Sequence, residues 1–199
     1  MTRRRHGLAR LIGDERGANA VEFALILPVF AGIILGFLDF GYWAYVRGAT
    51  TGAIETVARS SGVGGASVDP TVFEGDVETL VKTVAKDATF TWTKKSYYQF
   101  NGVGQPEKLT GDKNANGAYD AGDCFEDSNG NGNYDAAQGK TGIGGADDIL
   151  YYQVQVAFKP LVPLFGMFPG VPVGRTVTAA TMVKRQPFAA QVVPQIVCK

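Results

Sequence analysis

The chain has 199 residues, of which 45% are hydrophobic and 19% are charged, and its formal net charge is zero. This size and composition fit one small folded domain plus a membrane segment, and they exclude a disordered chain or a multidomain protein. Beyond residue 17 there are 14 basic and 17 acidic side chains, so the sequence carries no sign of nucleic-acid binding.

A basic head precedes a long apolar run. Residues 1–17 hold five arginines, and the run from Phe23 to Val46 has about 24 residues and a single charge, enough to cross a bilayer. Because basic flanks stay in the cytoplasm, we expect a cytoplasmic N-terminus and an external remainder. A cleaved secretory signal fits less well, since the run ends in the aromatic segment Phe40–Tyr45 rather than in a small-residue cleavage site.

Two helices are predicted next. The segment Arg47–Ser60 lacks proline and keeps small or apolar residues at a spacing of three to four, so the transmembrane helix should extend over residues 18–60. Asp69 and Pro70 then offer an N-cap and a first-turn proline for a second helix. Its apolar stripe should cover an apolar surface, and it consists of Phe73, Val77, Leu80, Val81 and Val84.

Alternating apolar and polar residues predict half-buried strands at 150–158 and 177–183, with weaker candidates at 89–93 and 97–100. The segment 160–172 is too rich in proline for a sheet interior and too apolar for an ordinary loop, so it is either an adhesive surface or a loop folded into the core. We predict an α+β fold, in which a long membrane-spanning helix leads into a small antiparallel sheet packed with a helix. Residues 61–199 would form the extracytoplasmic domain.

An insert rich in Asp, Asn and Gly, residues 110–148, contains one loop pattern twice, 15 residues apart. Twelve-residue calcium loops place oxygen side chains at positions 1, 3, 5, 9 and 12, a backbone carbonyl at position 7 and glycine at position 6. The first copy supplies Asp112, Asn114, Asn116, Ala118, Asp120 and Asp123, and the second supplies Asp127, Asn129, Asn131, Asn133 and Asp135. The repeat predicts two bound calcium ions that rigidify a long loop.

Position 12 departs from the pattern, because Asp123 is shorter than the usual glutamate and Gln138 is neutral. We therefore expect low affinity, and Glu126 or Asp147 and Asp148 could supply missing carboxylates. No pair of helices flanks the loops. The alternative is that these residues only form turns, which Asn, Asp and Gly favour.

The two cysteines, Cys124 and Cys198, both lie in the part predicted to be outside the cytoplasm, where a disulfide is allowed. Two unpaired thiols are the alternative, since sequence does not show how closely they approach. The only histidine, His6, is in the basic head, which excludes His-dependent triads and zinc sites from the external domain. We expect no enzymatic activity.

Residues 14–60 resemble the TadE-like minor pilins, or pseudopilins, of tight-adherence (Flp, type IVb) pilus systems. The resemblance rests on Gly17 followed by the pair Glu22-Phe23, on the segment 24–28 and on the tail element 184–188. It implies that a prepilin peptidase cuts after Gly17, which makes Ala18 the new N-terminus. Glu22 then lies about one helical turn further on and can pair with the Ala18 ammonium of its own or a neighbouring subunit. Without such a pair, Glu22 would be an interfacial carboxylate in contact with headgroups and water.

The resemblance implies a minor pilin that initiates, caps or assembles a pilus. It places the chain in the bacterial inner membrane as a single-pass protein, with its C-terminal domain in the periplasm or on the cell surface within a pilus. Expected partners are other pilins or pseudopilins, the prepilin peptidase and the inner-membrane assembly platform. The alternative is an anchored, calcium-dependent adhesion or binding module that is not part of a pilus, and cleavage after Gly17 separates the two.

Overall fold

The structure, a computed structural model, describes residues 17–63, 69–162, 174–185 and 189–199. Most of the basic head and of the proline-rich segment 160–172, and part of the tail element 184–188, lie outside these residues.

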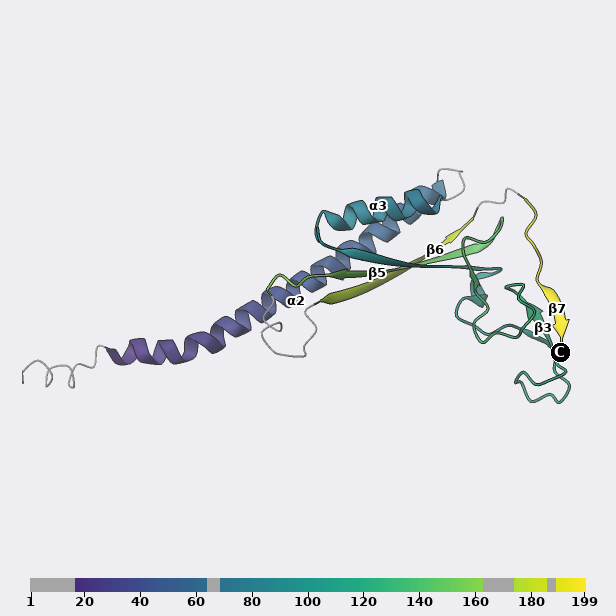
Figure 1. Cartoon of the computed structure of the whole chain (residues 1–199), viewed down its shortest axis with the longest axis horizontal. Helices are drawn as coiled ribbons and strands as arrows, with labels where there is room; N and C mark the ends of the chain where they lie inside the picture. The colour runs from purple at the N-terminus through teal and green to yellow at the C-terminus, as the bar shows by residue number, and fades with distance from the viewer. Residues whose placement is uncertain (1–16, 64–68, 163–173, 186–188) are drawn as a thin grey trace, which may run out of the picture. The chain divides into compact units, whose positions relative to one another are not determined.

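In chain order the elements are α2 (Ala18–Val63), α3 (Pro70–Lys82), β1 (Thr89–Tyr97), η2 (Phe100–Gly102), β2 (Leu109–Gly111), β3 (Cys124–Asp127), β4 (Lys140–Thr141), β5 (Ile149–Phe158), β6 (Arg175–Lys184) and β7 (Gln195–Cys198) (Figure 1). The predicted α+β fold is confirmed. Contacts divide the chain into two units, Met1–Tyr42 with Pro160–Val173, and Trp43–Lys159 with Gly174–Lys199.

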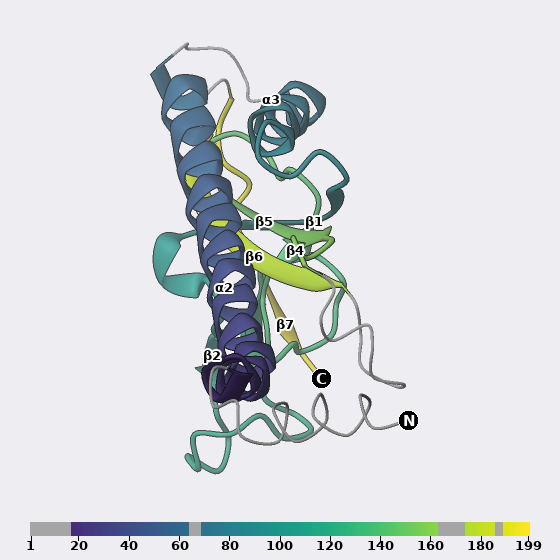
Figure 2. The same cartoon turned by 90° about the vertical axis from the view of Figure 1, so that its left-hand side faces the viewer.

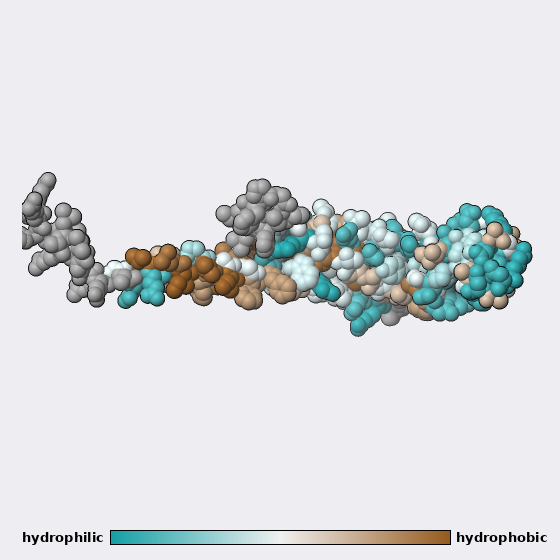
Figure 3. All heavy atoms as spheres, turned by 90° about the horizontal axis from the view of Figure 1, so that it is seen from below, coloured by the Kyte–Doolittle hydropathy of each residue, from teal (hydrophilic) through white to brown (hydrophobic). Residues whose placement is uncertain are grey.

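The described part of the first unit is dominated by the N-terminal portion of α2. Its large apolar side chains point outward, with Leu25 74% and Phe37 72% exposed, and they form the hydrophobic surface along this helix in Figure 3. Among the described residues, α2 is the one helix long and apolar enough to cross a bilayer. Exposing such a surface to water is strongly unfavourable, so α2 is compatible with the predicted single-pass anchor.

In the second unit, the C-terminal portion of α2 becomes amphipathic. Its buried side chains follow the helical repeat and are Val46, Thr50, Ala53, Ile54 and Val57. The Thr50 hydroxyl donates to the Val46 carbonyl at 2.8 Å, so its polar group is satisfied within the helix. The predicted continuation of the helix is confirmed, and the helix reaches Val63.

Helix α3 begins as predicted. The Asp69 carboxylate accepts a hydrogen bond from the Thr71 backbone N–H at 2.9 Å, and Pro70 occupies the first turn. Hydrogen bonds from Thr71, first from its hydroxyl and then from its N–H, lower the pKa of Asp69. Of the predicted stripe, Phe73, Val77 and Val81 are buried on α3. The prediction is wrong for the other two residues, because Leu80 is exposed and Val84 lies beyond the end of the helix.

A four-stranded antiparallel sheet in the order β4-β1-β5-β6 forms the centre of the second unit. One face is buried beneath α3 and the C-terminal portion of α2 (Figure 2). The ring of Phe73 stacks on that of Tyr152 at 4.3 Å, and the Trp43 indole N–H donates to the Thr176 carbonyl at 3.3 Å. Both predicted strands at 150–158 and 177–183 are confirmed as β5 and β6.

The weaker strand candidate at 89–93 is confirmed as part of β1, which runs from Thr89 to Tyr97 and pairs with β5 along its whole length. The candidate at 97–100 is wrong beyond Tyr97. The chain then leaves the ladder, and Phe100–Gly102 forms a 3-10 turn. A second sheet in the order β2-β3-β7, which the sequence did not predict, is built from strands of three or four residues.

Candidate functional site

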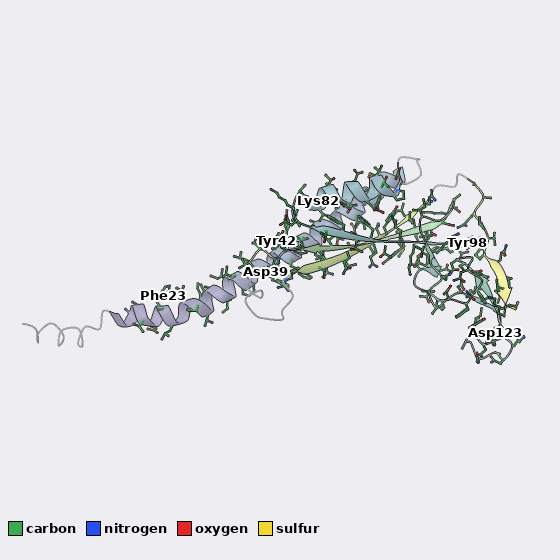
Figure 4. The ribbon with its side chains drawn as sticks, viewed as in Figure 1. Phe23, Asp39, Tyr42, Lys82, Tyr98 and Asp123 are labelled. Carbon is green, nitrogen blue, oxygen red and sulfur yellow. A yellow bond between two sulfur atoms is a disulfide. The ribbon has the colours of Figure 1, made fainter. Side chains whose placement is uncertain are left out.

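The two calcium-like loops are joined by strand β3. Loop 1 (Asp112–Asp123) follows β2, and loop 2 (Asp127–Gln138) begins at the last residue of β3. Strand β7 pairs with β3, so the end of the chain lies beside both loops. Asp123, the last residue of loop 1, is labelled in Figure 4, where side chains of this region gather near β7.

Loop 1 is folded by hydrogen bonds from its own backbone to its side chains. The Asp112 carboxylate accepts from the Gly117 N–H at 2.8 Å, which joins positions 1 and 6. Asn114 accepts from the Asn116 N–H at 3.1 Å, and Asn116 accepts from the Ala118 N–H at 2.8 Å. Gly117 has a φ of 77°, the left-handed conformation that favours glycine at position 6.

Loop 2 repeats each of these bonds. Asp127 accepts from the Gly132 N–H at 2.7 Å, Asn129 from the Asn131 N–H at 2.9 Å, and Asn131 from the Asn133 N–H at 2.7 Å. Gly132 has a φ of 72°. The sequence repeat is therefore also a repeat of backbone geometry.

In each loop two asparagines converge on the aspartate at position 9. The side-chain amides of Asn114 and Asn116 donate to one oxygen of Asp120 at 2.8 and 2.7 Å, which lowers the pKa of Asp120. Asn129 and Asn131 donate to one oxygen of Asp135 at 2.6 Å each. If one of these asparagine amides rotates by 180°, its oxygen takes the place of its NH2 group beside the aspartate. A cation bound there could then use this oxygen as a ligand.

One observation tests whether loop 1 fits a cation. Asp112 Oδ1 is buried and has no hydrogen-bond partner among the described residues, although it belongs to the carboxylate at position 1. An orphaned buried carboxylate oxygen is costly unless something binds it, and calcium prefers oxygen ligands of this kind. No group of three His, Cys, Asp or Glu side chains in the described ranges is arranged to hold a metal. A cation here would therefore depend on amide and backbone carbonyl oxygens as well as on carboxylates.

The carboxylates suggested as additional ligands have other partners. Glu126 pairs with Lys108 at 3.0 Å, and Asp147 pairs with Lys184 at 2.9 Å. Asp148 accepts from the Gly145 N–H at 2.6 Å. The carboxylate that reaches loop 2 is Glu107, which sequence reasoning missed because no motif surrounds it. Glu107 is 2% exposed, and burial raises the pKa of its carboxyl group.

The C-terminal residue ties the two loops together. Cys124 and Cys198 form a disulfide between β3 and β7. The Gly122 N–H donates to the Lys199 carbonyl, and the Lys199 N–H donates to the Asp123 carbonyl at 3.2 Å. The Lys199 ammonium donates to the Asn133 side chain at 3.3 Å. Loop 1 is thus held by the backbone of Lys199, and loop 2 by its side chain.

The predicted processing residues stand at the beginning of α2. Gly17 directly precedes the first helical residue, Ala18. Glu22 and Phe23 follow in the first turns, and both are exposed. Phe23 is labelled on α2 in Figure 4.

Residues 17–59 match the family model of TadE-like protein. No curated protein and no solved structure matches the chain. The matched segment includes all four processing residues and most of α2, and it ends before the sheets and loops. The match agrees with the resemblance seen in the sequence: residues 17–59 of this chain are similar to the corresponding segment of TadE-like proteins.

Proposed function

We propose that this chain is a minor pilin or pseudopilin that supports assembly of a tight-adherence, type IVb pilus. The observation that carries the proposal is the coincidence of the TadE-like match at residues 17–59 with the exposed apolar part of α2. In this proposal α2 anchors the chain in the bacterial inner membrane, with the N-terminus in the cytoplasm and the second unit in the periplasm or on the surface. TadE-like proteins are in general not enzymes, and the proposal assigns no catalytic role.

Processing would create the assembly signal. Cleavage by a prepilin peptidase after Gly17 would leave an ammonium on Ala18, about 6 Å of helical rise from Glu22. Pairing of these charges, within one subunit or between two, would neutralise both in a poorly hydrated setting. The outward-facing apolar side chains of α2 can contact lipid before assembly and helices of other pilins afterwards. The assembly platform in the inner membrane would be the remaining partner.

The proposal includes calcium as a structural ligand of the two loops. Support comes from the repeated loop geometry and from the orphaned oxygen of Asp112. In loop 1 the ligands would be Asp112, Asn114, Asn116, the Ala118 carbonyl, Asp120 and Asp123. In loop 2 they would be Asp127, Asn129, Asn131, the Asn133 carbonyl and Asp135. A bound cation would rigidify each of these loops.

The experiment is intact-mass measurement of the chain recovered from its native host. We expect the loss of residues 1–17 and a new N-terminus at Ala18. Gly17→Leu should block cleavage and pilus assembly, and Glu22→Gln should leave cleavage intact while reducing assembly. Gly32→Ala is the matched control, because a Cβ at Gly32 meets nothing within 4 Å. Recovery of full-length wild-type chain alone would refute the pilin assignment and favour a stably anchored binding module.

A further inference from the structure

Asp123 closes loop 1 by holding two parts of its backbone. One carboxylate oxygen accepts from the Lys113 N–H at 3.0 Å, and the other accepts from the Asp120 N–H at 2.8 Å. These donors occupy positions 2 and 9 of the loop. The carboxylate at position 12 therefore bridges the beginning of loop 1 to its second half.

Glu107 makes the same two contacts with loop 2. One of its oxygens accepts from the Ser128 N–H at 2.8 Å, and the other accepts from the Asp135 N–H at 3.1 Å. Ser128 and Asp135 are positions 2 and 9 of loop 2. The Glu107 N–H also donates to the Asp135 carbonyl at 2.9 Å, which fixes the segment that carries this glutamate.

Gln138, which the motif places at position 12 of loop 2, is engaged elsewhere. Its side-chain amide donates to the Pro106 carbonyl at 3.2 Å, and its backbone N–H donates to the Gln105 carbonyl at 3.1 Å. Gln138 therefore holds the chain segment that leads into Glu107, and Glu107 makes the contacts that position 12 makes in loop 1.

The charges around Glu107 favour a cation. Glu107 is 2% exposed and Asp127 is 7% exposed, so two acidic side chains of this region lie away from solvent. None of the described lysines or arginines forms an ion pair with Glu107, Asp127 or Asp135. Buried negative charges without a cationic partner are costly, and a divalent cation would compensate them.

We infer that Glu107 supplies loop 2 with the carboxylate that its own sequence lacks, so that the second cation site is built from two separate segments of the chain. The inference rests on the proposed calcium function. Its consequence is that a calcium ion in loop 2 ties the segment before β2 to the loop that follows β3, which extends the stiffening beyond the loop itself.

Calorimetric titration of CaCl2 into the full chain in detergent micelles tests this. We expect two sites in the wild type. Glu107→Gln should weaken one site at least tenfold and leave the other unchanged. Gln138→Ala should retain both sites, because the backbone N–H of residue 138 still donates to the Gln105 carbonyl and keeps the segment before Glu107 in place. Glu126→Gln is the matched control, because Glu126 is also a glutamate next to loop 2 but pairs with Lys108 on the surface.

The outcomes are distinct. If Glu107→Gln binds calcium as the wild type does, or if Gln138→Ala loses one site, the inference is overturned while the calcium proposal stands. If the wild type binds no calcium, both are overturned. Retention of the first site and of the Cys124–Cys198 disulfide shows that Glu107→Gln is folded. If Glu107→Gln does not fold, the titration of Gln138→Ala gives the answer: two sites in that variant support the inference, and the loss of one site overturns it.

Discussion

The rings of Tyr119 and Tyr134 stack with their centroids 4.4 Å apart and their planes 9° from parallel. Each tyrosine is position 8 of its loop, so equivalent residues of the two copies meet. Both rings also form T-shaped pairs with the ring of Phe125 in β3, with centroids 5.5 and 5.6 Å apart. Phe125 is fully buried, so the two loops share one small aromatic core.

Calcium should raise the melting temperature of the full chain in detergent micelles. If the sites bind at 10⁻⁴ to 10⁻³ M, as extracellular modules do, about 10 mM calcium would stabilise the native state by about 1.4 to 2.7 kcal/mol per site. The double variant Asp112→Ala/Asp127→Ala should lose this rise. The measurement compares melting in calcium and in chelator. An unchanged wild-type melting temperature with no calorimetric signal would reduce the loops to glycine-rich turns.

Phe125→Ala should destabilise the second unit and weaken calcium binding at both loops together. Removing a fully buried phenylalanine typically costs about 3 to 5 kcal/mol, and here the lost contacts belong to both tyrosines. Phe100→Ala is the matched control, because Phe100 is 57% exposed and should change stability by less than about 0.5 kcal/mol. Loss of calcium binding at one loop alone would show that the aromatic core does not couple them.

The disulfide between Cys124 and Cys198 should be measurable as an absence of free thiols in the full chain, purified in detergent without reductant and then denatured. Cys124→Ala/Cys198→Ala should lower the free energy of unfolding by about 2 to 4 kcal/mol, because the bridge closes a long loop and holds β7 on β3. Two reactive thiols in the wild-type protein would refute the bridge.

Local chemistry made much of the fold predictable. Strands β5 and β6 follow from alternation with period two, and the start of α3 follows from Asp69 and Pro70, because in each case neighbouring residues carry the signal. The second sheet was not predictable, since β2, β3 and β7 are too short to show a period and form only where distant segments meet.

The loops were likewise predictable only in part. Their repeat was visible in the sequence because each loop is folded by hydrogen bonds between residues two to six positions apart. The role of Glu107 was not visible, because it lies 21 and 28 residues from the two N–H groups it holds. Arg185 is similar, since its guanidinium donates to the Gly144 carbonyl at 2.8 Å across 41 residues.

Tyr152 lies in the core with a hydroxyl that has no hydrogen-bond partner among the described residues. Burial raises the pKa of Tyr152 from 10 to about 12. The neutral form is thus favoured in the folded state, and above pH 10 the unfolded chain ionises first. The contribution of the Tyr152 hydroxyl to the free energy of unfolding is fully present below pH 10. It falls by about 2 to 3 kcal/mol as the pH rises from 10 through about 12.

Tyr152→Phe should remove most of this alkaline loss. At pH 7 it should leave the free energy of unfolding unchanged or raise it by up to about 1 kcal/mol. The reason is that it deletes an unsatisfied buried hydroxyl and keeps the ring that stacks on Phe73. Denaturant unfolding of both proteins between pH 7 and pH 12 measures the difference, and other groups that titrate in this range cancel in the comparison. Tyr151→Phe is the control, because the Tyr151 hydroxyl donates to Gln153 at 2.9 Å on a half-buried part of the same strand. A Tyr152→Phe variant that is less stable than wild type by more than about 1 kcal/mol at pH 7 would show that the hydroxyl has a hydrogen-bond partner, such as a buried water.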